Sequence, residues 1–207
     1  MNASLTIDDI MQAAPVVPVI VIEDAADAVP LAEALVAGGL PCLEVTLRTP
    51  AALDAIRAMA QVDGAIVGAG TVLDQRGLAD AREAGAQFIV SPGLTEPLVK
   101  AAQRDAIPFL PGVANASDIM RGLDLGLDRF KFFPAMAAGG IPALEALSAP
   151  FGQVRFCPTG GIGPDNAEEW LSHPAVTCVG GSWVAPKGRA DREKIVSLAK
   201  EAAALSR

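Results

Sequence analysis

Short apolar runs alternate with alanine-rich segments of helical periodicity along nearly the whole chain, and this alternation restricts the fold more than any other feature. The runs cover residues 16–22, 42–47, 65–70, 87–91, 108–113, 129–134, 154–160 and 177–184. Repeated strand–helix units bring parallel strands together with helices outside them, and eight such units close a barrel. The sequence therefore predicts an α/β fold, specifically a (β/α)8 TIM barrel.

The segments between the runs carry helix boundary signals, with Asp, Thr or Pro near several starts and Gly after several ends. Residues 6–13 predict a short extra N-terminal helix, with Thr6 as N-cap and Asp9 completing an approximate capping box. We expect this helix to cross the bottom of the barrel, where the strands begin. No linker divides the chain, so residues 1–207 are expected to form a single domain.

The composition limits the possible partners. A formal charge of −8 argues against a nucleic-acid-binding surface, and an anionic ligand would need a local pocket. The apolar run at residues 16–22 is too short to span a membrane and no signal peptide is evident, so we expect a cytoplasmic protein. Hydrophobic residues make up 51% of the chain, which favours contacts between subunits. The three cysteines lie in apolar runs without a CxxC motif, which indicates reduced core thiols.

A lysine interrupts the aromatic run RFKFFP at residues 129–134. Because side chains alternate along a strand, Phe130 and Phe132 are predicted to face the helices and Lys131 the barrel axis. In the run LEVTLR the same alternation directs Glu44, Thr46 and Arg48 inward. A carboxylate and a guanidinium are therefore expected near the lysine, at the end of the barrel where catalysis takes place in this fold.

Lys131 is the only lysine in a predicted strand. A partly desolvated amine beside a cation such as Arg48 or Arg129 is more easily neutral, which a Schiff-base nucleophile requires. Strand placement alone fits a structural ion pair with Glu44 equally well. Glu44 is thus either an ion-pair partner or the group that relays protons during imine formation.

Glycines follow the last two predicted strands. Gly160, Gly161 and Gly163 precede a helix expected to open at Pro164, while Gly180, Gly181 and Ser182 end the eighth strand. In barrels of this kind the loops after strands seven and eight hold phosphate through backbone N–H groups and a helix N-terminus. The alternative is that these glycines only form tight turns.

Several other chemistries lack the residues they need. A single histidine, His173, cannot build a histidine metal site, and Ser91 has no base partner for hydrolysis. Glu44 is the only evident acidic residue on the inner face, which disfavours a magnesium site built from carboxylates. We therefore expect neither a metal nor a cofactor.

The sequence resembles the class I 2-keto-3-deoxy-6-phosphogluconate (KDPG) aldolase family, which includes 4-hydroxy-2-oxoglutarate (KHG) aldolases. The resemblance covers nearly the whole chain and rests on the following motifs, in order: PVVPVIVI, LEVTLRTP, GAGTVL, SPGLTEPL, FKFFPA, RFCPTGGI and GGSW. It implies a homotrimeric lyase of the Entner–Doudoroff pathway that cleaves a phosphorylated keto acid to pyruvate and glyceraldehyde 3-phosphate without metal.

The resemblance also implies roles for individual residues. Lys131 would form the Schiff base and Glu44 would be the general acid and base. The keto acid and its carboxylate would be held by Arg48, Thr71 and Thr159. The phosphate would be held by Gly160, Gly161, Gly180, Gly181 and Ser182.

Three alternatives remain open at this stage. The same chemistry could act on unphosphorylated 4-hydroxy-2-oxoglutarate or on the galactonate epimer of the phosphorylated substrate. The chain could also be a barrel that binds sugar phosphates without catalysis.

Overall fold

The computed structural model of the protein describes residues 5–186, 188 and 191–206; the rest of the predicted 1–207 domain lies outside the described residues. The strands are β1 (Val16–Ile20), β2 (Cys42–Thr46), β3 (Ile66–Gly70), β4 (Phe88–Val90), β5 (Phe109–Leu110), β6 (Gly112–Val113), β7 (Arg129–Phe132), β8 (Arg155–Pro158) and β9 (Val179–Gly181). The helices are α1 (Ile7–Gln12), α2 (Ala28–Ala37), α3 (Ala52–Met59), α4 (Gln75–Glu83), α5 (Glu96–Arg104), α6 (Ala116–Asp124), α7 (Gly140–Ser148), α8 (Ala167–Leu171) and α9 (Arg192–Ala203), with a 3-10 helix η1 (Ala25–Asp27) before α2. Within the described residues no helix is both long enough and apolar enough to cross a bilayer.

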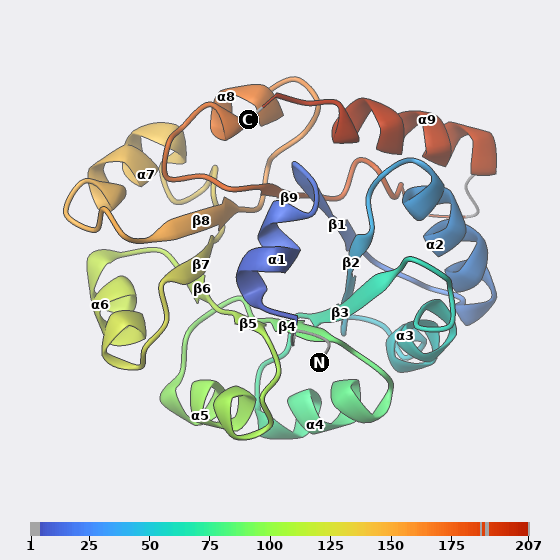
Figure 1. The fold of residues 1–207 in the computed structure, drawn as a ribbon, viewed down its shortest axis with the longest axis horizontal. Helices are drawn as coiled ribbons and strands as arrows, with labels where there is room; N and C mark the ends of the chain where they lie inside the picture. Colours follow the sequence, from blue (N-terminus) through green and yellow to red (C-terminus); the bar gives the residue numbers. More distant parts are fainter. Residues whose placement is uncertain (1–4, 187, 189–190, 207) are drawn as a thin grey trace.

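The strands stand side by side in a curled arrangement, and the helices α2 to α9 surround them (Figure 1). Every strand pairing in the described part of the chain is parallel. One sheet has the order β5-β4-β3-β2-β1-β9 and the other has the order β6-β7-β8. Parallel neighbours need crossover connections, which here are helices that cover the outer face of the strands. The predicted α/β class with parallel strands is confirmed.

The predicted run at residues 108–113 is divided into β5 and β6 at Pro111. Proline has no N–H to donate, so it interrupts the ladder. Backbone hydrogen bonds nevertheless continue on both sides of this point: Ser91 N donates to Leu110 O (3.2 Å) and Lys131 N donates to Pro111 O (2.9 Å). At the other junction of the two sheets, Thr159 and Gly180 form a parallel bridge.

Alternation along the strands separates two apolar clusters. Outward side chains such as Leu43 pack between the strands and the helices. Phe132 also faces outward, as predicted, and its ring centroid lies 6.3 Å from that of Trp170 in α8. The smaller cluster lies inside the ring of strands and consists of Ile10, Met11, Val17, Cys42, Phe88, Val90, Leu110, Cys157 and Cys178. The three cysteines are buried and reduced, as the sequence predicts.

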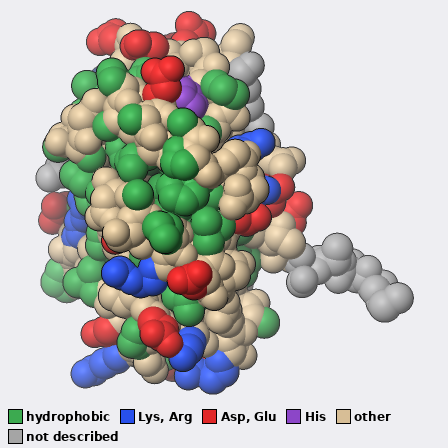
Figure 2. Space-filling model, turned by 90° about the vertical axis from the view of Figure 1, so that its left-hand side faces the viewer, with side chains coloured by type: hydrophobic (Ala, Val, Ile, Leu, Met, Phe, Trp, Pro, Cys, Tyr) green, Lys and Arg blue, Asp and Glu red, His purple; other side chains and the backbone are tan. Residues whose placement is uncertain are grey.

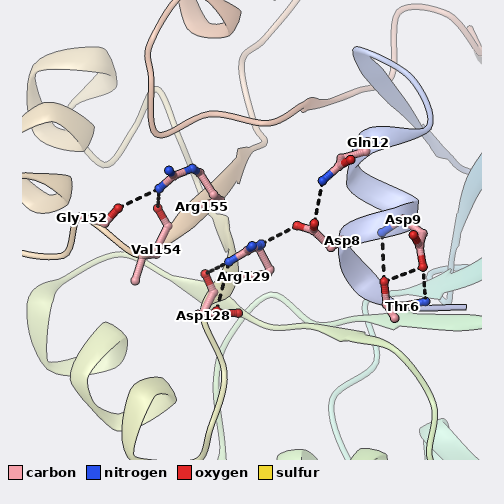
Figure 3. Close-up of polar contacts among 9 residues, drawn as sticks. All are labelled: Thr6, Asp8, Asp9, Gln12, Asp128, Arg129, Gly152, Val154 and Arg155. Atoms are coloured by element: carbon pink, nitrogen blue, oxygen red, sulfur yellow. Dashed lines mark hydrogen bonds and ion pairs between the residues drawn. The ribbon is translucent and has the colours of Figure 1, made fainter.

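The N-terminal helix α1 crosses the centre of the ring (Figure 1). It begins at the predicted capping box: Asp9 N donates to Thr6 Oγ1 (3.2 Å) and Thr6 N donates to Asp9 Oδ2 (2.8 Å). Ile10 and Met11 are buried against the inner cluster. Asp8 reaches Arg129, the first residue of β7, at 2.6 Å from Nε to Oδ1 (Figure 3). The expected position across the bottom of the strands is therefore confirmed.

Candidate active site

The catalytic candidates Lys131 and Glu44 form a buried ion pair. They come from β7 and β2, which lie on opposite sides of the ring in Figure 1. Lys131 Nζ lies 3.0 Å from Glu44 Oε1 and 3.4 Å from Oε2. The two side chains are 6% and 4% exposed. The predicted inward orientation of both residues thus brings together an amine and a carboxylate shielded from water.

An aromatic ring completes the surroundings of the amine. Lys131 Nζ lies 5.4 Å from the ring centroid of Phe133, which is within the range of a cation–π interaction. Phe133 also lines the cavity that opens beside this pair. The ammonium therefore has two favourable contacts in place of hydration, one with a carboxylate and one with a ring face.

Arg48 and Thr71 lie together at the ends of neighbouring strands. Arg48 Nε donates to Thr71 Oγ1 at 3.2 Å. Thr71 has a φ of 59°, a left-handed conformation that is costly for a β-branched residue. Backbone strain of this kind is retained where the surrounding structure requires it. Here it places the Thr71 hydroxyl against the exposed guanidinium of Arg48.

Two further threonines, to which the sequence analysis gave no role, fix the chain on either side of Arg48. Thr46 Oγ1 donates to Ile20 O at 2.9 Å, and Thr49 Oγ1 donates to Ile22 O. The first bond joins the last residue of β2 to the last residue of β1, and the second joins the segments that follow these two strands. The inward position of Thr46 between Glu44 and Arg48 was a signal for this role, because a buried hydroxyl needs a partner.

A cavity of about 380 Å³ opens at the carboxyl ends of the strands. Its lining includes most of the predicted binding residues: Arg48, Thr159, Gly160, Gly161, Gly180 and Ser182. Gly160 and Gly161 have φ values of 106° and 78°, which an L side chain would disfavour. Gly181 does not line the cavity, because its Cα faces the ring of Trp183. The predicted glycine-rich loops after β8 and β9 therefore meet at one cavity.

The helix after these glycines begins later than the sequence predicts. Pro164 lies in a turn, and α8 starts at Ala167 with Asn166 before it. The Asn166 amide donates to Gly161 O (3.1 Å), and its carbonyl oxygen accepts from Gly163 N (2.9 Å). The expectation that Pro164 opens the helix is wrong because these bonds close a turn first. The wall of the cavity after β8 is therefore formed by the turn that contains Gly160 and Gly161, not by the start of a helix.

Arg129 and Arg155 lie at the opposite end of the strands from this cavity, where β7 and β8 begin (Figure 3). Arg129 is paired with Asp8 and Asp128. Arg155 donates to the backbone oxygens of Gly152 and Val154 (Figure 3). The suggestion that Arg129 could neighbour the amine of Lys131 is therefore wrong, because strand alternation gives the face of a side chain but not its position along the strands.

The arrangement supports amine chemistry better than thiol or metal chemistry. Burial raises the pKa of the Cys42 thiol to about 12, so this thiol stays protonated and is a poor nucleophile. Within the described residues, no group of three or more His, Cys, Asp or Glu side chains is arranged to hold a metal ion. The Lys131–Glu44 pair can exchange a proton over 3.0 Å, which gives a neutral amine next to a carboxylic acid.

Comparison with known proteins places this site in a family context. Residues 7–199 match the family model for "KDPG and KHG aldolase". The chain is 62% identical to a 2-dehydro-3-deoxy-phosphogluconate aldolase of Zymomonas mobilis over 97% of both chains, and 55% identical to a KHG/KDPG aldolase of Escherichia coli over 97% of this chain and 96% of that one. It is also similar to a crystal structure of Legionella pneumophila KDPG aldolase with pyruvate captured as a covalent carbinolamine, with 47% identity, a TM-score of 0.94 and coverage of 98% and 100%.

Proposed function

Because the chain belongs to the KDPG and KHG aldolase family, we propose that it cleaves 2-keto-3-deoxy-6-phosphogluconate to pyruvate and D-glyceraldehyde 3-phosphate through a Schiff base on Lys131. The activity is that of a lyase, and relatives that are 62% and 55% identical carry the corresponding names. The observation that carries the proposal is the buried contact of 3.0 Å between Lys131 Nζ and Glu44 Oε1 beside an open cavity.

The reaction begins with proton transfer from Lys131 to Glu44, which leaves a neutral amine. The amine nitrogen attacks C2 of the keto acid, and the proton that the nitrogen then loses passes to the C2 oxygen to give a carbinolamine. Glu44 donates the proton with which this hydroxyl leaves as water, and a cationic imine forms. The Legionella relative, captured with a covalent carbinolamine, supports this step.

Cleavage uses the cationic imine as an electron acceptor. Glu44, now a carboxylate, removes the C4 hydroxyl proton. The electrons of that O–H bond form the aldehyde carbonyl, and the C3–C4 bond electrons pass to the imine nitrogen as an enamine. Protonation of the enamine at C3 gives the pyruvate imine. Hydrolysis then releases pyruvate and restores Lys131.

The rest of the site holds the two ends of the substrate. Arg48 and Thr71 bind the carboxylate and so keep C2 within reach of the amine. Thr159, whose hydroxyl is buried in the cavity wall, contacts the keto acid. The phosphate lies against the loops of Gly160, Gly161, Gly180, Gly181 and Ser182. Such a local cradle of backbone N–H groups suits an acidic protein that binds an anion.

We infer that the two sheets are parts of one closed (β/α)8 barrel that forms a single domain. The hydrogen bonds that flank Pro111 and the bridge between Thr159 and Gly180 support closure at the two junctions. On this view β5 and β6 are one strand interrupted by a proline, which gives the eight strand positions that a barrel needs.

The assembly is a homotrimer in the cytoplasm. Exposed large apolar side chains support contacts between subunits: Leu73 is 65% exposed, Met120 57% and Met136 50%. Figure 2, which views the side where α6 and α7 lie, shows apolar side chains gathered across the middle of that face. Three reduced, buried cysteines fit a reducing compartment.

Cleavage assays with a lactate dehydrogenase couple for pyruvate test the proposal. The wild type is expected to cleave 2-keto-3-deoxy-6-phosphogluconate with a higher kcat/KM than the galactonate epimer or 4-hydroxy-2-oxoglutarate, and EDTA is expected to have no effect. Lys131→Met is expected to abolish turnover of all three. Substantial turnover by a folded Lys131→Met variant would rule out the imine. Substrate binding without turnover by the wild type would favour a non-catalytic sugar-phosphate-binding barrel.

A further inference from the structure

Two glycines, Gly68 and Gly70, occupy successive inward positions of β3, and one of them lies against the catalytic carboxylate. In the β2–β3 ladder Gly68 is the partner of Glu44, and Gly70 is the partner of Thr46. The Glu44 side chain leans toward the carboxyl end of the strands and covers Gly70. A Cβ atom on Gly70 would lie 2.2 Å from Glu44 Oε1 and 2.7 Å from its Cγ. The carboxylate therefore fills the space of a missing side chain.

Neither partner in this contact is free to move away. Ordinary van der Waals contact begins near 3.4 Å, so a methyl group at Gly70 would require Glu44 Oε1 to move by 1.2 Å from its 2.2 Å separation. The same oxygen is the one that lies 3.0 Å from Lys131 Nζ. The backbone of Gly70 is held as well, because Gly70 O accepts a hydrogen bond of 2.8 Å from Leu47 N.

We propose that Gly70 is a positioning residue for Glu44: the absence of a side chain at this position permits the carboxylate conformer that contacts Lys131. The kinetic part of this inference rests on the proposed function, in which Glu44 relays protons to the amine and the substrate. A misplacement of about 1 Å in a catalytic group lowers turnover by about 100-fold. A side chain at Gly70 is therefore expected to act on kcat through Glu44.

The kinetic test compares Gly70→Ala with Gly68→Ala. Gly68 is the matched control because it faces inward on the same strand and is equally crowded, but its Cβ would meet the Phe88 ring at 2.4 Å and not Glu44. Gly70→Ala is expected to lower kcat by about 100-fold with KM changed less than about threefold. Gly68→Ala is expected to lower kcat by less than about tenfold. Equal losses of kcat, or a Gly70→Ala variant with wild-type kcat, would overturn the proposal.

A stability test separates positioning from general damage to the barrel. Glu44→Ala removes each Glu44 atom that the new methyl group would meet. Gly70→Ala is therefore expected to lower the urea midpoint strongly in the wild-type background and only slightly in the Glu44→Ala background. Gly68→Ala is expected to lower the midpoint equally in both backgrounds.

This comparison of stabilities remains decisive if Gly70→Ala alone does not fold, since Glu44→Ala/Gly70→Ala is then expected to be nearly as stable as Glu44→Ala. A double variant that is much less stable than Glu44→Ala would contradict the inference. The result is also independent of enzyme activity. A wild-type protein without aldolase activity would refute the proposed function while the stability comparison still tested the contact between Gly70 and Glu44.

Discussion

Removing the amine of Lys131 leaves Glu44 as a buried carboxyl group without its cation, and this predicts a large loss of stability. The Glu44 side chain is 4% exposed, and its contact with Lys131 Nζ is 3.0 Å long. Lys131→Met keeps the length of the side chain but removes its charge. The carboxyl group in this variant must either stay ionised in the interior or take up a proton.

Either state of the carboxyl group lacks its partner in the interior. Breaking a buried ion pair by removal of one partner costs about 3–5 kcal/mol, because the remaining group is left uncompensated. Replacing both partners by neutral side chains of similar size costs less, because neither charge is then buried.

Urea unfolding followed by tryptophan fluorescence measures this cost, because Trp170 is buried beside Phe132. Protein concentration is kept constant so that assembly does not change the comparison. The free energy of unfolding of Lys131→Met is expected to be about 3–5 kcal/mol below that of the wild type at pH 7. The matched control, Glu44→Gln/Lys131→Met, is expected to recover much of this loss. A loss below about 1 kcal/mol in Lys131→Met, as for an exposed pair, or a double variant that is as unstable as Lys131→Met, would refute the account of a buried ion pair.

Three further predictions concern residues around the site and in the core. Thr71→Gly is expected to raise the free energy of unfolding by about 1 kcal/mol, because it relieves the positive φ of 59°. It is also expected to raise KM because the hydroxyl contact to Arg48 is lost, whereas Thr71→Ser is expected to keep KM near the wild-type value. Gly77→Ala in α4, where a Cβ would be no closer than 3.5 Å to Asp74 Oδ1, is expected to raise the free energy of unfolding by about 0.5–1 kcal/mol; a lower urea midpoint would contradict this. Burial raises the pKa of Cys42 to about 12, so this thiol is expected to escape alkylation at pH 8 until urea unfolds the protein, and rapid labelling of the folded protein would contradict its burial. The contribution of Cys42 to stability is expected to be present below pH 9 and lost as pH rises toward 12.

The alternation of side chains along strands and the capping residues at helix ends predicted most of the architecture. The inward face of Glu44 and Lys131, the outward face of Phe132 and the Thr6–Asp9 capping box follow from local rules, and the structure confirms them. These features depend on residues that are close in sequence. Periodicity and capping chemistry therefore suffice to predict them.

The position of a side chain along its strand, and contacts between residues that are distant in sequence, could not be predicted in the same way. Arg129 shares a face with Lys131 but lies at the opposite end of the strands from the cavity, against Asp8. Its depth is set by strand register and by the position of α1, which no local pattern in the sequence encodes. The late start of α8 depends on the hydrogen bonds of Asn166 to the glycine turn. The closeness of Gly70 to Glu44 likewise depends on the register of β2 and β3.

Borohydride reduction of the protein in the presence of pyruvate, followed by intact-mass and peptide mass spectrometry, tests the central claim most directly. An imine between pyruvate and the Lys131 amine would be reduced to a stable secondary amine. The account predicts one adduct per chain, on the peptide that contains Lys131, and its absence in a folded Lys131→Met control. An unmodified Lys131 in folded protein, or an adduct on another lysine, would contradict the claim that this buried amine is the nucleophile.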